Sequence, residues 1–301
     1  MYNIEELKDK TRGRKITILG HDNIDVDAFL SGILLSNLFN FMGIDNEFII
    51  LDKVNEGETY NIVKEIFEID MKEWMKVGEK QTRYLFLEDH FETVHGGKVI
   101  GCIDHHPTNR HLDYEYQYRR NSCASAYLIY ELMKKLKYPL TEKEAKMIVV
   151  SMMIDTTAFK STKTIPEEVK TAEELALHYG LDYDYLLKYC LCLTPIDSMK
   201  IEEIVKNGKK HYNYAGVQVE SSYLQLYGMP NEDTLNEWLK YLKDSIKNTT
   251  IIMHVFIIFE TENIQTIEYQ ITKKTTKCTV YNGILSRGKD IMPRIEKMFF
   301  N

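Results

Sequence analysis

Short apolar runs alternate with segments of helical periodicity over the first half of the chain. The apolar runs are KITILG at 15–20, EFIILD at 47–52, RYLFLED at 83–89 and KVIGCID at 98–104. Runs that are apolar on both faces and separated by helices are typical of the strands of a parallel sheet. Helical patterns follow at 123–137 and 141–153, and Pro166 with two acidic residues marks the start of another helix. The pattern therefore predicts a parallel α/β domain whose second half is mainly helical.

A second domain is predicted from the change of pattern after residue 190. The stretch LCLTPIDSM at 191–199 interrupts the helical periodicity and is the candidate linker. Strand-like runs follow at 216–222, 251–259, 266–271 and 277–282, together with one helical stretch at 232–246. We therefore expect an N-terminal domain at 1–190, with helices on both faces of its sheet, and a smaller mixed α/β domain at 200–301.

Length and charge limit the classes of partner. The chain has 301 residues and is 44% hydrophobic, which is enough for two cores. Its formal charge is −7 with acidic and basic residues interspersed, so no basic stripe for a long nucleic acid is expected. The N-terminus lacks an apolar signal core, and the longest apolar run is too short to span a membrane. None of the five cysteines forms a C-x-x-C pair. A soluble cytoplasmic protein without a membrane segment is predicted.

Acidic residues and histidines gather at four separate places, each beside or after an apolar run. They are His21, Asp25 and Asp27; Asp89 and His90; Asp104, His105 and His106; and Asp155. The carboxyl ends of parallel strands face one crevice, so these segments can converge in space. Taken singly, each has a structural explanation as a capped turn or a helix end. Four in succession favour a metal site instead.

The ligand types restrict the metal. Two imidazoles and several carboxylates without a thiolate suit Mn²⁺, with Fe²⁺, Co²⁺, Mg²⁺ and Zn²⁺ as competitors. The ligands are too many for one ion, and two ions roughly 3.5–4 Å apart would activate a hydroxide for displacement at phosphorus. In an extended segment the rings of His105 and His106 would point to opposite sides, one toward a metal and the other toward a bound anion. The chemistry predicted is hydrolysis of a phosphoanhydride or phosphoester.

The order of these motifs resembles that of the DHH phosphoesterase superfamily. GHDNIDVDA, LEDHFE, CIDHHPTN and MMIDTTAFKS look like its four motifs, and NSCASAYLIYELMKK resembles its small-residue turn into a helix. GILSRGKDIMPRIEK at 283–297 is similar to the SRKKQ-type signature of manganese-dependent family II inorganic pyrophosphatases and related exopolyphosphatases. The glycine-rich, histidine-containing signature of the other C-terminal domain in this superfamily is not found. The resemblance thus implies a DHH domain followed by a substrate-clamping domain.

The resemblance also implies individual roles. One metal would be held by His21 and Asp25 and the other by Asp27 and His105, with Asp89 and Asp155 shared between the ions. His106 would face the phosphate, and Asp104 would orient the histidines. Arg287 and Lys289 would clamp the substrate's outer phosphate, joined by Lys206, for which Lys200, Lys209 and Lys210 are alternatives.

Three departures from the family pattern affect the expected substrate. Ile24 replaces a proline, Val26 and Ala28 flank Asp27 in place of threonine and serine, and Gly288 replaces the first lysine of the C-terminal signature. The resemblance implies a manganese-dependent hydrolase of inorganic pyrophosphate. The alternatives are an exopolyphosphatase, an (oligo)nucleotide phosphoesterase of the same superfamily, or a relative that binds phosphate ligands with little turnover. The prediction also allows a homodimer.

Overall fold

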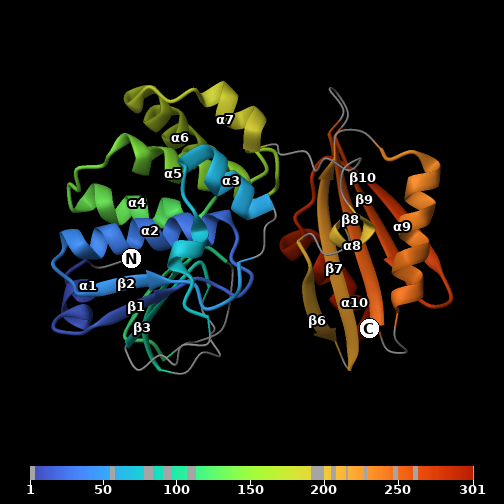
Figure 1. Ribbon diagram of the computed structural model, residues 1–301, viewed down its shortest axis with the longest axis horizontal. Coiled ribbons are helices and arrows are strands. Elements are labelled where there is room, and N and C mark those ends of the chain that lie inside the picture. The colour runs from blue at the N-terminus through green and yellow to red at the C-terminus, as the bar shows by residue number, and fades with distance from the viewer. Residues whose placement is uncertain are drawn as a thin grey trace. The chain divides into compact units, whose positions relative to one another are not determined.

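The structure, a computed structural model, consists of two compact units (Figure 1). It describes residues 4–54, 58–77, 84–90, 97–106, 113–190, 200–204, 208–214, 216–226, 229–246, 250–259 and 264–300. The first unit comprises Met1–Phe159 and Lys163–Cys190, and the second comprises Lys160–Thr162 and Leu191–Asn301. The short segment at 160–162 thus belongs with the C-terminal part of the chain. The predicted linker at 191–199 lies outside the described residues.

The first unit contains a five-stranded sheet in which every neighbouring pair of strands is parallel. Its strand order is β2-β1-β3-β4-β5. The strands are β1 (Ile16–Leu19), β2 (Asn46–Ile49), β3 (Tyr84–Glu88), β4 (Lys98–Asp104) and β5 (Tyr116–Arg119). All four predicted strands are confirmed. The edge strand β5 was not predicted, because its short run of alternating tyrosines and polar residues lacks the continuous apolar character of the others.

One helix precedes the first strand, others lie between strands, and a series of four follows the last strand of this sheet (Figure 1). They are α1 (Ile4–Thr11), α2 (Val26–Phe41), α3 (Glu58–Phe67), the 3₁₀ helix η1 (Met71–Trp74), α4 (Ser125–Lys135), α5 (Glu142–Asp155), α6 (Pro166–Tyr179) and α7 (Tyr183–Cys190). Helix α2 is buried along most of its length and packs against the sheet, α4 and α5. Helix α5 begins with a capping box between Thr141 and Glu144. The α/β class and the helical second half are confirmed.

The second unit contains a mixed sheet of order β10-β9-β8-β7-β6, in which only β7 and β8 are parallel among the described pairs. Its elements are α8 (Ile201–Ile204), β6 (Lys210–Tyr214), β7 (Val217–Leu226), α9 (Glu232–Ser245), β8 (Thr250–Phe259), β9 (Ile264–Ile271), β10 (Thr276–Asn282), the π-helical turn η3 (Arg287–Ile291) and α10 (Met292–Phe300). The predicted smaller mixed domain is therefore confirmed.

Helices α9 and α10 cover opposite faces of this mixed sheet. Trp238 of α9 packs in one cluster with Leu224 of β7, whereas Ile295 of α10 packs in another cluster with Val219 of the same strand. Residues 219 and 224 lie an odd number of positions apart, so their side chains point to opposite faces of the strand. Each face of the second sheet therefore has its own apolar core.

No helix among the described residues combines the length and the apolar character that crossing a bilayer requires.

Candidate metal centre

The acidic residues and histidines predicted from the sequence meet at one end of the parallel sheet. His21 lies two residues beyond β1, Asp89 directly follows β3, and His105 directly follows β4. Asp89 has a φ of 58°, in the left-handed region, and its backbone N–H donates to Ile103 O at 2.9 Å. This tight turn points the Asp89 carboxylate into the crevice and keeps it there. Asp155 reaches the same place from the last position of α5.

His21 presents its Nε2 atom to two carboxylates. Its Nδ1–H donates to the carbonyl of Asp22 at 2.8 Å, which fixes the ring. The Nε2 atom then lies 3.3 Å from Asp25 Oδ2 and 3.6 Å from Asp89 Oδ2. Asp25 is the N-cap of α2 and accepts a hydrogen bond from Ala28 N at 3.0 Å. One Asp25 oxygen thus caps the helix while the other faces His21.

His105 is the most buried ring of the cluster. Its Nδ1–H donates to Ser122 O at 3.1 Å, so Nε2 is the atom directed at the acidic residues. That atom lies 3.3 Å from Asp89 Oδ1, 3.5 Å from Asp155 Oδ2 and 3.9 Å from Asp27 Oδ2. It is fully enclosed and has no hydrogen-bond partner among the described residues. A buried ring nitrogen facing carboxylates without a bond of its own is suited to binding a metal ion.

Asp27 is held by the N-terminus of α4. Ser125 N donates to Asp27 Oδ2 at 2.7 Å and Ala126 N donates to Oδ1 at 3.2 Å. The hydroxyl of Ser31, one turn further along α2, also donates to Oδ1 at 3.0 Å. These three donors satisfy the oxygens of a side chain that is only 1% exposed.

Ser125 is a site residue that the sequence analysis missed. Its hydroxyl donates to Asp89 Oδ1 at 2.8 Å and accepts from His105 N at 3.2 Å, while its backbone N–H holds Asp27. One residue thereby joins three of the four motifs. The only sequence signal was the small-residue turn before α4, which indicates close packing and does not single out a particular serine.

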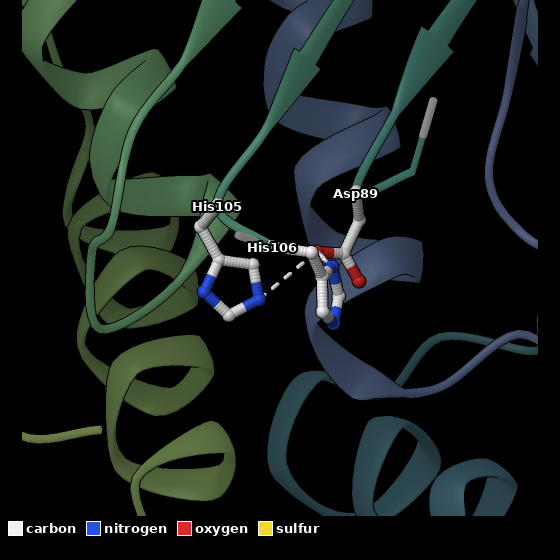
Figure 2. Close-up of side chains that lie close together, drawn as sticks. All are labelled: Asp89, His105 and His106. Carbon is white, nitrogen blue, oxygen red and sulfur yellow. Dashed lines mark ion pairs between the residues drawn. The ribbon is translucent and has the colours of Figure 1, made fainter. Parts of the chain in front are cut away.

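The rings of His105 and His106 lie side by side, which corrects the expectation that they point to opposite sides (Figure 2). Their centroids are 4.4 Å apart, and His106 Nδ1 lies 3.8 Å from Asp89 Oδ1. Asp104 Oδ1 accepts from both the backbone N–H and Nδ1 of His106, at 3.0 and 2.9 Å. These two bonds bend the chain after β4, so the alternation of an extended strand no longer applies. His106 is the more exposed of the two rings.

Neighbouring carboxylates raise the pKa of both His21 and His105. Burial lowers the pKa of His21, but Asp25 and Asp89 outweigh this effect and raise the pKa to about 9. Burial likewise lowers the pKa of His105, but Asp155 and Asp89 raise it to about 10. Without a metal, both rings are therefore imidazolium ions at neutral pH.

The surroundings lower the pKa of one carboxyl group of the site and raise the pKa of two others. Burial raises the pKa of Asp89, but His105, His106 and His21 outweigh it and hold the pKa below its usual range. Burial and the Asp89 charge raise the pKa of Asp27 well above its usual value. Glu88 is also fully buried; neither of its oxygens has a hydrogen-bond partner among the described residues, and burial raises its pKa. Asp27 and Glu88 thus favour the protonated form more strongly than a carboxyl group in water does.

The donor set fits divalent cations. Two groups have ligand atoms within 4.8 Å of one another: Asp89 with His105 and His106, and His21 with Asp25 and Asp89. Asp89 belongs to both groups, because Oδ2 faces His21 and Oδ1 faces His105. Imidazole nitrogens and carboxylate oxygens without a thiolate suit a borderline-hard ion such as Mn²⁺. The structure therefore brings together His21, Asp25, Asp27, Asp89, His105 and Asp155.

The remaining predicted residues have different surroundings. His90 donates from Nδ1 to Glu88 O at 3.0 Å, and its ring meets that of His21 edge-on. Arg287 begins the turn η3 in the second unit, where its guanidinium donates to the carbonyls of Gly208 and Ser221 and lies over the Tyr223 ring. Lys289 belongs to the same turn. Lys206 lies outside the described residues.

This chain resembles known proteins in sequence. Residues 15–157 match the model described as "DHH family, N-terminal domain". Two relatives, each named "Probable manganese-dependent inorganic pyrophosphatase", come from Lactobacillus helveticus and Bacillus mycoides. Both are 23% identical to this chain; the alignments cover 94% and 95% of it and 98% and 99% of the relatives.

Two solved structures share the fold. The first is described as a "putative family II inorganic pyrophosphatase" from Methanococcus jannaschii; it is 20% identical, covers 95% of this chain and 100% of its own, and has a TM-score of 0.77. The second is an exopolyphosphatase-related protein from Bacteroides fragilis, which is 18% identical, covers 90% of this chain and 83% of its own, and has a TM-score of 0.50. At these identities the likeness establishes the fold.

Proposed function

We propose that this chain, whose residues 15–157 form a DHH-family N-terminal domain, is a manganese-dependent phosphohydrolase that hydrolyses inorganic pyrophosphate to phosphate. One observation carries the proposal: the Asp89 carboxylate offers one oxygen to His21 and the other to His105. A carboxylate placed between two histidine-containing groups is the arrangement that a pair of metal ions requires. The names of the full-length relatives support both the metal and the substrate.

The proposed ligands follow from these contacts. His21 and Asp25 would hold one Mn²⁺ ion, Asp27 and His105 the other, and Asp89 and Asp155 both, with Mg²⁺, Co²⁺ or Fe²⁺ as alternative ions. When bound, such a pair lowers the pKa of a water molecule and neutralises charge on the phosphoryl oxygens. The protein's part is to fix the ligands, which it does through Ser125, Ser122 O and the N-terminus of α4.

His106 is proposed to act on the substrate itself. Asp104 holds its Nδ1, and the ring is 37% exposed, whereas that of His105 is 2% exposed. As an imidazolium, His106 would keep its Nδ1–H on Asp104 and donate from Nε2 to a phosphoryl oxygen, where a fixed donor stabilises the charge that develops during displacement. Asp104 is fully buried and is proposed to orient this ring.

Arg287 and Lys289 are proposed to bind the outer phosphate, and Lys206 is the predicted third cation. The turn that carries the first two is fixed by Ser286, which caps it by accepting from Lys289 N. Arg287 already uses part of its guanidinium to bind backbone carbonyls, so its plane is preset before any substrate arrives. Arginine suits bidentate phosphate contact and lysine suits a point-charge contact.

A longer polyphosphate is the second candidate substrate, because Gly288 removes one positive charge from the C-terminal signature. A clamp with fewer positive charges discriminates less strongly between compact pyrophosphate and longer polyphosphates. Hydrolysis of an (oligo)nucleotide phosphoester and phosphate binding with little turnover are the less favoured functions. A cytoplasmic location and a homodimer also stay predictions for this chain.

A panel of phosphate-release assays tests the proposal. Purified protein would be supplied with Mn²⁺, Mg²⁺ or Co²⁺ and offered pyrophosphate, tripolyphosphate, longer polyphosphate, nucleotides and linear dinucleotides. We expect Mn²⁺ with pyrophosphate to give the fastest release. Faster release from polyphosphate would favour the second substrate. Tight binding of pyrophosphate without release from any compound would contradict hydrolysis and favour a binding protein with little turnover.

A further inference from the structure

Lys163 places a positive charge within the cluster of acidic residues, in a position that the sequence analysis did not single out. Its Nζ atom lies 2.7 Å from Asp155 Oδ2, and the two side chains are 18% and 16% exposed. The same Asp155 oxygen lies 3.5 Å from Nε2 of His105. Lys163 therefore contacts the oxygen that faces the proposed metal position.

The chain between Asp155 and Lys163 follows an unusual path. Thr157, Ala158 and Phe159 have φ values of 55°, 49° and 61°, so three consecutive non-glycine residues adopt the left-handed conformation. This conformation is unfavourable for residues that carry a Cβ, and it persists where the surroundings enforce it. Such strain is common at functional sites, although strain alone does not identify one.

Hydrogen bonds hold this turn in place. The Thr156 hydroxyl donates to Met152 O at 2.5 Å and accepts from Phe159 N at 3.0 Å. Ala158 N donates to Met153 O at 2.6 Å. The turn reverses the chain after α5, so that a lysine eight positions beyond Asp155 returns to its carboxylate. The hydrogen bonds among residues 152–159 therefore set the direction in which the chain leaves α5.

The ammonium group and a metal ion would compete for Asp155. Both carry positive charge, so an ammonium that stays on the oxygen to which a metal ion binds adds repulsion between the two cations. A metal ion that binds Asp155 Oδ2 therefore competes with the ammonium for that oxygen. Lysine has a flexible stem of four carbons and three donors, so a displaced ammonium stays within reach of the site. A phosphoryl oxygen is a strong acceptor of suitable charge.

We propose that Lys163 is a substrate-binding residue of the N-terminal domain, which pairs with Asp155 in the metal-free protein and with a phosphoryl oxygen once metal ions are bound. This inference rests on the proposed phosphohydrolase function and adds a substrate contact to it. Two effects follow: the ammonium lowers the affinity of the free site for metal, and it raises the affinity of the loaded site for a phosphate ligand.

The test compares Lys163→Met, which removes the charge, with Lys163→Arg, which keeps it. Lys170→Met is the matched control, because Lys170 on α6 is exposed and pairs only loosely with Glu174, at 3.9 Å. Calorimetric titration of metal-free protein with Mn²⁺ gives the first readout. Binding of imidodiphosphate, a non-hydrolysable analogue of pyrophosphate, at saturating Mn²⁺ gives the second.

For Lys163→Met we expect Mn²⁺ to bind at least as tightly as to the wild type, and imidodiphosphate to bind about tenfold or more weakly, the usual effect of losing a charged hydrogen bond. Lys163→Arg should retain imidodiphosphate affinity to within about threefold, and Lys170→Met should match the wild type. Unchanged imidodiphosphate binding by Lys163→Met would overturn the proposal. Loss of Mn²⁺ binding by that variant would also overturn it, since Lys163 would then organise the metal ligands.

Neither readout requires turnover, so the two proposals can fail separately. A wild-type protein that binds Mn²⁺ and imidodiphosphate but releases no phosphate would contradict the hydrolase, while the Lys163 comparison would still be decided. If Lys163→Met does not fold, Lys163→Gln takes its place, because its amide N–H can still donate to Asp155 without the charge.

Discussion

Ser125 at the start of α4 donates its hydroxyl proton to Asp89 Oδ1 at 2.8 Å, across 36 residues of sequence. The oxygen that accepts this bond also lies 3.3 Å from His105 Nε2. The hydroxyl therefore fixes the rotamer of the carboxylate that faces both histidines. A group that orients a metal ligand commonly affects metal binding almost as strongly as the ligand does.

Replacement of Ser125 by alanine should weaken metal binding. Without the hydroxyl, Asp89 loses its fixed orientation, and we expect Mn²⁺ affinity to fall about 10–100-fold. Titration with Mn²⁺ measures this directly. Ser151→Ala is the control, because Ser151 is equally buried but its hydroxyl has no hydrogen-bond partner among the described residues. Equal Mn²⁺ affinity in the two variants would argue against the orienting role.

Replacement of Asp89 by asparagine should remove metal and activity together. The amide keeps the size of the side chain but offers one neutral acceptor where the carboxylate offers two charged ones. We expect bound Mn²⁺, measured by elemental analysis, to fall by at least one ion per chain and phosphate release to be lost. Asp22→Asn serves as the control, since His21 contacts Asp22 through its backbone carbonyl. An unchanged metal content in Asp89→Asn would contradict the proposed ligand set.

Replacement of Arg287 by alanine should act mainly on substrate binding. The variant loses a proposed phosphate contact, so KM for pyrophosphate should rise about tenfold or more while kcat changes less. It also loses the bonds to Gly208 O and Ser221 O, so the second unit should be less stable by about 1 kcal/mol. Steady-state kinetics and thermal unfolding separate the two effects. Lys277→Ala, at an exposed position of β10, should leave KM unchanged.

The metal-free protein should lose stability as the pH rises. Burial lowers the pKa of His21 and of His105, but neighbouring carboxylates raise them to about 9 and about 10. A raised folded-state pKa contributes stability that is complete below the unfolded value of about 6.5 and is lost as the pH rises through the folded value. With chelator present, the free energy of unfolding of the wild type should approach that of His105→Gln between pH 6.5 and 9.5. If the difference in free energy of unfolding between the wild type and His105→Gln stayed constant over this range, the ion pairs of His105 with the carboxylates would be contradicted.

A methyl group at position 20 should disturb the first turn of the site. A Cβ on Gly20 would lie 2.7 Å from Glu88 Oε1 and 3.1 Å from Ile24 Cδ1. Glu88 is fully buried and cannot move toward solvent, so Gly20→Ala should destabilise the protein by about 1–3 kcal/mol. Denaturant unfolding measures the change. At Gly288 a Cβ would have no neighbour within 4 Å, so Gly288→Ala should stay within about 0.5 kcal/mol of the wild type.

Several features could be read from the sequence because each depends on a local pattern. The apolar run KVIGCID coincides with β4, and Pro166 is the first residue of α6. The convergence of His21, Asp89 and His105 could also be foreseen, because parallel strands direct their carboxyl ends toward one edge. In each case a periodicity or a topological rule fixes the secondary structure or the position of many residues at once.

Other features depended on contacts between segments that are distant in sequence. Ser125 and Lys163 are common residue types without a pattern around them, and only packing brings one to Asp89 and the other to Asp155. The rings of His105 and His106 lie together because Asp104 bends the chain after β4, which overrides the alternation of a strand. Sequence alone thus determined four strands of the parallel sheet, the helices with clear periodicity and the ligand types. The tertiary structure decided which side chains orient those ligands, because hydrogen bonds between distant segments form only when the whole domain is packed.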